Sequence, residues 1–250
     1  MGLIETEGVI LKSYSLAEAD KIVIFLTQEQ GLIRGVAKGA KRLKSKFGGS
    51  LEPFTIVKLE YNQKEERELV SIRQIELLKS YFEKAAEPIF LQKFSYLADL
   101  LIEFSPPNDP NQRLYRMTKV CLQASDNSLQ ILDIITLYFE LWLLRLGGYL
   151  PDWEVCNVCK RKLELNESAS IQINFQLLCN LCRKTRNSLM VSGKERELFN
   201  SAQKLSPENF IEYSRAYNAE VKDISTILKR IISHILGKEV IGEKVILAIN

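Results

Sequence analysis

The spacing of the apolar residues changes near Tyr81, and this change divides the chain into two kinds of structure. Before Tyr81, short runs rich in Val, Ile, Phe and Thr are bounded by turn residues, which is the pattern of β-strands. These runs cover residues 7–14, 21–27, 32–37, 54–61 and 68–77. After Tyr81, apolar residues recur every three or four positions, the period of helices that bury one face. The pattern therefore predicts an α+β protein with its strands first and its helices second.

Five short strands leave exposed sheet edges unless the sheet closes on itself. A small barrel removes those edges, and an OB-fold barrel over residues 1–80, a fold that binds nucleic acid, is the natural candidate. Strand count alone does not exclude another five-stranded barrel, such as an SH3-like one. Residues 81–250 are expected to form an all-helical domain with an insertion at about 151–192.

Five helices are expected in the second part of the chain, and turn residues mark their ends. The boundary residues are Pro88 and Ser105 for the first helix, Asp109 and Pro110 at the start of the second, Ser128 at the start of the third, Ser206 and Pro207 at the start of the fourth, and Gly237 at the end of the fifth. Pro favours the first helical turn, Ser and Asp cap helix N-termini, and Gly ends helices.

Two CxxC pairs lie inside the predicted insertion. Their residues are Cys156 and Cys159, then Cys179 and Cys182. Two residues between thiols let both sulfurs point at one centre, and two such turns complete a tetrahedron, so the spacing predicts one structural Zn²⁺ in a zinc ribbon with short strands in residues 163–175. An iron site or a metal-free pair of turns stays open as an alternative. The fifth cysteine, Cys121, fits a buried core position better than a ligand position.

The stretch from 31 to 49 concentrates positive charge, although the whole chain has 34 Lys and Arg against 31 Asp and Glu, a net charge of only +3. Its cations, which have no carboxylate among them, are Arg34, Lys38, Lys41, Arg42, Lys44 and Lys46. Such a local patch usually meets phosphates, and Phe47 is expected to offer a ring on which a base stacks, with Tyr14 and Tyr61 as further aromatic candidates. The alternative is a solvated loop that only keeps the barrel soluble.

Nothing in the sequence singles out a catalytic site. The one histidine, His234, falls near the end of the last helix, where a partly solvated residue is more common than a catalytic one, and there is no Walker, GxGxxG or HExxH motif. No run approaches the ~18 apolar residues of a membrane span, and the first residues carry Glu5 and Glu7 where a targeting segment would have a basic region followed by an apolar run. We therefore expect a cytoplasmic, non-enzymatic protein without a small-molecule substrate.

Two stretches carry a resemblance to a known family. GLIRGVAKGAKRLKSKFGGSLEPF at residues 31–54, and RLGGYLPDWEVCNVCK at residues 145–160 followed by the second CxxC, resemble RecO, the bacterial recombination mediators. The resemblance implies binding of single- and double-stranded DNA, annealing of complementary strands, and partnership with RecR and the C-terminal tail of single-strand-binding protein to load RecA. It places the DNA-contacting cations and the zinc ligands on the six basic residues and four cysteines named above.

The resemblance is incomplete around the cysteines. Many members have Gly directly after the second Cys, where this chain has Lys160, and a Gly pair before the third, where it has Leu177 and Leu178. We expect a nucleoid-associated DNA repair and recombination mediator that binds without sequence preference, because phosphate contacts carry no sequence information. An RNA-binding zinc module and a protein-only scaffold are the alternatives.

Overall fold

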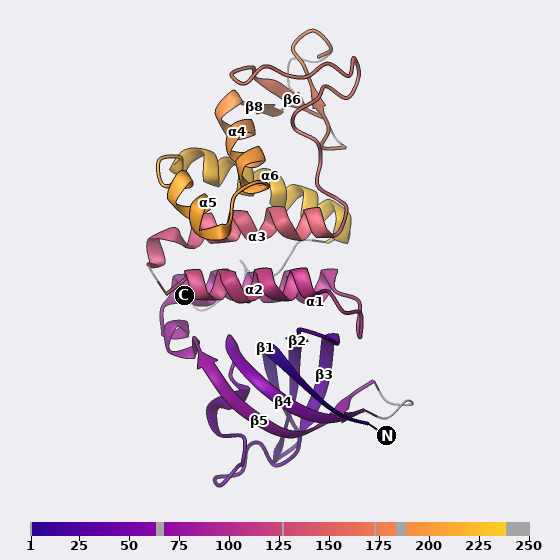
Figure 1. Cartoon of the computed structure of the whole chain (residues 1–250), viewed down its shortest axis with the longest axis vertical. Coiled ribbons are helices and arrows are strands. Elements are labelled where there is room, and N and C mark those ends of the chain that lie inside the picture. The colour runs from indigo at the N-terminus through magenta and orange to yellow at the C-terminus, as the bar shows by residue number, and fades with distance from the viewer. Residues whose placement is uncertain (1, 64–67, 127, 173, 184–188, 239–250) are drawn as a thin grey trace. The chain divides into compact units, whose positions relative to one another are not determined.

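The computed structural model describes residues 2–63, 68–126, 128–172, 174–183 and 189–238. These residues fall into two compact units, one up to Leu129 and one from Gln130 onward. The first unit holds the first five strands and the first two helices, and the second holds the remaining helices, a small sheet and the cysteine pairs (Figure 1). The boundary between the compact units therefore lies beyond the predicted domain boundary at residue 80, because two helices pack in the same unit as the strands.

Five strands form a closed barrel, as the sequence predicts. They are β1 Gly2–Leu16, β2 Asp20–Thr27, β3 Gly31–Ala37, β4 Thr55–Gln63 and β5 Val70–Ser80. Their order around the barrel is β1-β2-β3-β5-β4, and a parallel pair between β3 and β5 completes it. This is the crossed order of an OB-like barrel, whereas a barrel that joined sequential neighbours throughout would have no parallel pair.

The length of β1 allows the barrel to close. Its first half pairs with β4 and its second half with β2, and a bulge between Ile10 and Lys12 bends it between the two partners. Alternate residues of the strands point inward, so that Ile10, Phe25 and Val57 lie in a fully buried core. The apolar alternation of the sequence therefore has its expected cause, a sheet with one face turned inward.

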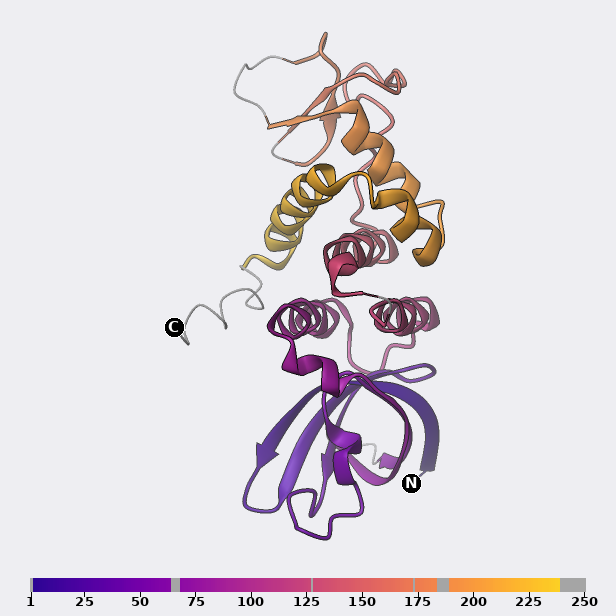
Figure 2. The same ribbon diagram turned by 90° about the vertical axis from the view of Figure 1, so that its left-hand side faces the viewer.

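Two helices accompany the barrel in the first unit. They are α1 Pro88–Phe104 and α2 Gln112–Ala124, drawn in purple and magenta beside the indigo strands in Figure 2. The predicted ends of α1 are confirmed. The predicted start of α2 at Asp109 and Pro110 is wrong, because the side chain of Asn111 accepts the hydrogen bond from the backbone N–H of Leu114 and caps the helix there.

Polar contacts fasten both helices to β1. The Glu7 carboxylate accepts hydrogen bonds from the Tyr115 hydroxyl and the Lys119 ammonium of α2, each at 2.6 Å. Lys12 forms an ion pair with Asp99 of α1. Burial by itself raises the pKa of Glu7, but the hydrogen bonds from Lys119 and Tyr115 outweigh it and hold the pKa below its usual value of 4.5.

Replacing Glu7 by Gln is expected to destabilise the first unit by about 1–2 kcal/mol at pH 7, because the buried Tyr115 hydroxyl loses a charged acceptor. A carboxyl whose pKa is lowered by folding stabilises the fold above its unfolded pKa and loses that contribution as pH falls through the folded value. The difference in unfolding free energy between the variant and the native protein should therefore shrink below pH 4.5. Urea unfolding at pH 7 and pH 3.5 measures it.

Glu5 provides the matched control for Glu7. It lies on the same strand but pairs with Lys58 at the surface, where both side chains are about half exposed. Replacing Glu5 by Gln should change stability by less than ~0.5 kcal/mol, because exposed ion pairs contribute little. An equal loss at both pH values for the Glu7 variant would contradict the assigned role of the charge.

Four α-helices and a small sheet make up the described part of the second unit. The helices are α3 Leu132–Leu146, α4 Gly193–Ala202, α5 Pro207–Ser214 and α6 Asn218–Leu236. Ser206 caps α5 and Gly237 ends α6 with a left-handed conformation, as predicted. Ser128 does not cap α3, because a short 3-10 turn, η3 Leu129–Ile131, comes between them.

The helix α4 is absent from the five predicted from the sequence. Ser192 and Glu195 form a capping box at its start, in which each side chain bonds the other residue's backbone N–H. Only Leu198, Phe199 and Ala202 give α4 an apolar stripe, which is too short a pattern to reveal a helix of ten residues. No helix within the described ranges is both long enough and apolar enough to span a bilayer.

Candidate nucleic-acid interface and metal centre

The predicted cations lie on one strand and the loop that follows it. Arg34 is on β3, and the other five lie between the end of β3 and the 3-10 turn η1 Gly48–Leu51. All six side chains are exposed. No carboxylate in the described part of the chain forms an ion pair with any of them. Their charge therefore faces solvent without internal neutralisation.

Backbone contacts fasten this loop to the turn between β1 and β2. The N–H of Gly39 donates to the Asp20 carboxylate at 2.7 Å, and the N–H of Lys41 donates to the carbonyl of Ala19 at 2.9 Å. Gly39 has a positive φ of 71°, which a residue with a Cβ seldom adopts. OB barrels bind ligands on strands two and three and on the loop between strands one and two. The basic loop thus lies beside the generic ligand-binding region, although it follows the third strand in sequence.

Phe47 does not have its predicted role. Its side chain is only 2% exposed and belongs to the barrel core together with Leu51. Directly after the cations the chain turns back onto the barrel, and Phe47 packs into its core. Tyr61 is also fully buried, 6.2 Å from the ring of Phe25, so neither ring can stack on a base. Tyr14 remains exposed.

Arg73 also belongs to the basic surface, although no feature of the sequence predicts it. It is an exposed residue of β5, and its backbone carbonyl accepts a hydrogen bond from the Lys46 ammonium. In the amide orientation that satisfies both groups, Asn62 accepts two hydrogen bonds from its guanidinium, at 2.9 and 3.0 Å. A single Arg in a strand resembles any solvent-facing residue, and only the pairing of β5 with β3 places it near the basic loop.

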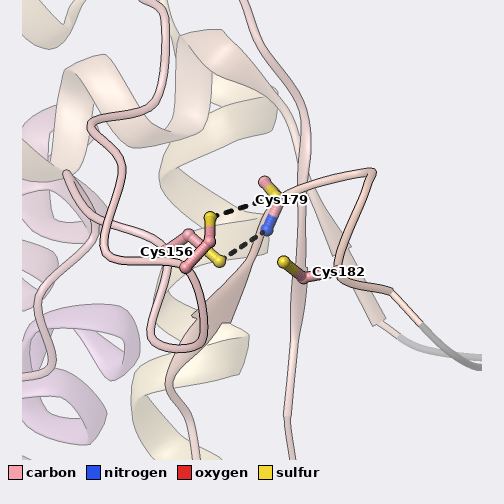
Figure 3. A group of neighbouring side chains, drawn as sticks. Cys156, Cys179 and Cys182 are labelled. Atoms are coloured by element: carbon pink, nitrogen blue, oxygen red, sulfur yellow. Dashed lines mark hydrogen bonds between the residues drawn. The ribbon is translucent and has the colours of Figure 1, made fainter.

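The four cysteines of the CxxC pairs converge on one point. Their sulfurs all lie within 4.8 Å of one another, and the Sγ atoms of Cys159 and Cys179 are 3.8 Å apart. Figure 3 shows Cys156 on one segment, and Cys179 and Cys182 on a second, with the sulfurs directed toward one another. Zn–S bonds of about 2.3 Å in a tetrahedron place sulfurs about 3.8 Å apart. The donor set and its spacing therefore fit a metal ion with four thiolate ligands.

Comparison with known proteins shows the family to which the chain belongs. The model of the family described as Recombination protein O N terminal matches residues 1–81, and that of Recombination protein O C terminal matches residues 94–241. The chain belongs to the RecO family. The expected resemblance is confirmed, and so is the class of DNA repair and recombination proteins to which the family belongs.

Several curated RecO proteins are similar over much of this chain. The DNA repair protein RecO of Thermodesulfovibrio yellowstonii is 33% identical over 179 residues, 71% of this chain and 69% of its own length. That of Koribacter versatilis is 32% identical over 160 residues, which is 64% of this chain and 65% of its own length. The RecO of Dehalococcoides mccartyi is 26% identical over 236 residues, 94% and 91% of the two chains. The similarity therefore extends across both units.

In this RecO family member, backbone N–H groups stabilise the thiolate of Cys156 at the four-cysteine site. Burial by itself raises the pKa of the Cys156 thiol, but backbone N–H groups of Cys179, Cys159 and Val158 outweigh it and lower the pKa to about 6. A hydrogen bond with the sulfur of Cys179, together with burial, raises the pKa of Cys182 to about 12. A bound metal cation reverses this effect, because it stabilises every thiolate that it contacts.

The departures from the RecO pattern have visible structural consequences. Lys160 takes a positive φ of 60°, and its N–H closes the first knuckle by donating to the carbonyl of Cys156 at 2.9 Å. A residue with a Cβ costs about 1 kcal/mol in this conformation. Leu177 and Leu178 form the strand β7 Leu177–Leu178, pair with β6 Ala169–Ile171 and are buried. They therefore supply apolar packing where the resemblance leads us to expect glycines.

A buried arginine connects the segment with the CxxC pairs to α4. Arg196 is only 4% exposed, and it donates hydrogen bonds of 2.9 Å to the backbone carbonyls of Trp153, Glu164 and Glu167. The Trp153 ring stacks on Phe199 of the same helix with centroids 4.0 Å apart. The small sheet has the order β7-β6-β8, with β8 at Leu189–Val191. Of the predicted strand region 163–175, β6 is confirmed, and residue 173 lies outside the described residues.

Proposed function

We propose that this RecO family member binds single- and double-stranded DNA through the sugar-phosphate backbone, without sequence specificity. The observation that carries the proposal is the set of exposed cations on β3 and the following loop, with no carboxylate partner among the described residues. Compensated cations, such as Lys21 with Glu52 at 3.0 Å, occur elsewhere on the same barrel. A surface with free positive charge binds polyanions by releasing their counterions.

Annealing of complementary strands follows from the same surface. Two phosphate backbones repel each other, and a strip of cations screens that repulsion when both strands are bound. Base pairing then supplies the free energy of the reaction. The protein needs no nucleophile, general base or catalytic metal for this activity, and we propose that it is a mediator and not an enzyme.

We propose that the four-cysteine site holds Zn²⁺ in a structural role. Four thiolates leave no coordination position for water or substrate, so the metal would stabilise the segment that contains both knuckles. An iron site uses the same ligands but absorbs visible light, so metal analysis with an absorption spectrum distinguishes the two.

We further propose that the protein acts in the bacterial cytoplasm, associated with the nucleoid, and loads RecA together with RecR and the C-terminal tail of single-strand-binding protein. These partners rest on family membership alone. The proposed DNA contacts all lie in the first unit, so the second unit would be available to bind partner proteins.

The decisive experiment is a salt titration of native protein binding to matched single-stranded DNA, duplex DNA and RNA. We expect binding to single-stranded DNA that is insensitive to permuted sequence, with log affinity falling against log salt at a slope of about −4 for six contacts. Stronger binding to RNA than to matched DNA would favour an RNA-binding module. No nucleic-acid binding at low salt would favour a protein-only scaffold.

A further inference from the structure

Cross-strand pairing places three apolar side chains in a row on the outside of the barrel. Tyr14 of β1 pairs with Ile22 of β2, and Ile22 pairs with Val36 of β3. Residues that lie directly opposite each other on neighbouring strands point to the same face of a sheet. Val23 and Ala37, the sequence neighbours of this row, point into the core, so the row faces outward.

Two of the candidate DNA-binding cations flank this row. Arg34 and Lys38 are two residues before and two residues after Val36 on the same chain, and both are exposed. A period of two places Arg34 on the same face as Val36, and Lys38 directly follows the end of β3 on that side. The outer face therefore has an apolar strip between two positive charges.

The row lies at the solvent-exposed end of this outer face of the sheet. Leu26 on β2 is fully buried, Ile24 is 7% exposed, Ile22 is half-buried and Tyr14 is 47% exposed. The covered end is next to the connection between α1 and α2, where the N–H of Asn108 donates to the carbonyl of Leu32 at 3.1 Å. The helices thus protect one end of the outer face and leave the end near the basic loop accessible.

The ring of Tyr14 is exposed at the surface of the barrel. Lys12, two residues away on β1, pairs with Asp99 of α1. The carboxylates of Asp20 and Glu52 at this end of the barrel are bonded to Gly39 and Lys21. The ammonium of Lys21 therefore offsets the charge that Glu52 presents to an approaching phosphate.

We propose that Tyr14, with Ile22 and Val36 beside it, is a stacking platform for one unpaired nucleobase, and that Arg34 and Lys38 hold the adjoining phosphates. This inference rests on the proposed function and adds a base-binding element to it. An aromatic ring stacks on the face of any base, so the platform has no sequence preference. Bases in a duplex present only their edges, so the platform favours single-stranded over double-stranded DNA on a surface whose cations do not distinguish them.

The test is the full chain with Tyr14→Ala, measured against oligo(dT) and a duplex of equal length. Stacking contributes about 1–3 kcal/mol per base, so affinity for the single strand should fall roughly 5- to 140-fold. Duplex affinity and the salt slope should not change, because no phosphate contact is lost. Tyr14→Phe and Tyr14→Trp should keep native affinity, and Tyr14→Leu, which keeps apolar bulk without the ring, should behave like Tyr14→Ala.

Tyr149→Ala is the matched control, because Tyr149 is 52% exposed and lies in the second unit. It should bind both DNAs as the native protein does. An equal loss for single strands and duplex, full affinity of the Leu variant, or no loss in any variant would overturn the platform. Absence of DNA binding by the native protein would instead overturn the proposed function, so the two failures are distinguishable. If the Ala variant unfolds, the Leu variant decides.

Discussion

Replacing Lys41, Arg42, Lys44 and Lys46 together by Ala is expected to weaken binding to single-stranded DNA on the order of several hundred-fold at about 0.1 M salt. Each lost phosphate contact removes about 0.7 from the salt slope and, at that salt concentration, about 0.7 of a decade in affinity. The slope of log affinity against log salt should therefore fall in magnitude by about 3. Annealing should slow in parallel, because the variant screens two backbones less well. Fluorescence anisotropy across a salt series measures the affinity for single-stranded DNA and its salt slope.

The control for this variant removes the same charge elsewhere. Arg113, Lys194, Lys222 and Arg230 are exposed residues on helices, outside the basic loop. Replacing these four by Ala changes the net charge equally and should leave the salt slope close to native. The loop side chains are exposed, so the quadruple variant should unfold at nearly the native temperature. A native salt slope in the loop variant would show that these cations do not contact phosphates.

Removing the metal is expected to have the largest effect on stability. Structural zinc contributes about 10–16 kcal/mol in small zinc-finger peptides. Here the packing of Trp153 on Phe199 and the hydrogen bonds of Arg196 also hold the segment, so we expect a loss of about 5 kcal/mol. For a unit of this size that lowers the midpoint of thermal unfolding by about 20 °C. Calorimetry of native protein with and without a chelator, and of Cys179→Ser, measures it.

The metal prediction has its own controls. Native protein should contain one zinc per chain, and Cys121→Ala should keep it, because Cys121 is a buried residue of α2 far from the two knuckles in sequence. DNA binding by the barrel should survive metal loss, since the candidate contacts lie in the first unit. A protein that contains no metal, or that keeps its midpoint after chelation, would contradict a structural ion at these cysteines.

Local patterns were sufficient for most elements. The period of two located all five strands, and Pro88, Ser206 and Gly237 marked helix ends that the structure confirms. Local patterns did not predict the start of α2, where several residues that favour a helix start lie next to one another. Asn111 caps α2 although Asp109 and Pro110 precede it, because a cap depends on which side chain reaches the first free N–H groups.

The candidate sites divide in the same way. The two CxxC pairs could be read from spacing alone, because two residues between thiols fit one ligand geometry, and the structure brings all four sulfurs together. The basic stretch was equally visible as an unbalanced run of charge. The prediction for Phe47 is wrong because sequence does not show which side of the chain faces the core, and its immediate neighbours Lys46 and Gly48 are both exposed.

The sequence by itself determined the kinds of structure, the family, the positive charge of the loop after the third strand and the set of four cysteines that could hold a metal ion. These depend on residue type and on spacing over a few positions, so they are local properties of the chain. Only the tertiary structure decided which aromatic ring faces solvent and which cations share a surface. Tyr14, Ile22 and Val36 become neighbours through strand pairing, and Arg73 of β5 contacts Lys46 of the basic loop, because barrel closure, and not sequence proximity, determines which side chains meet.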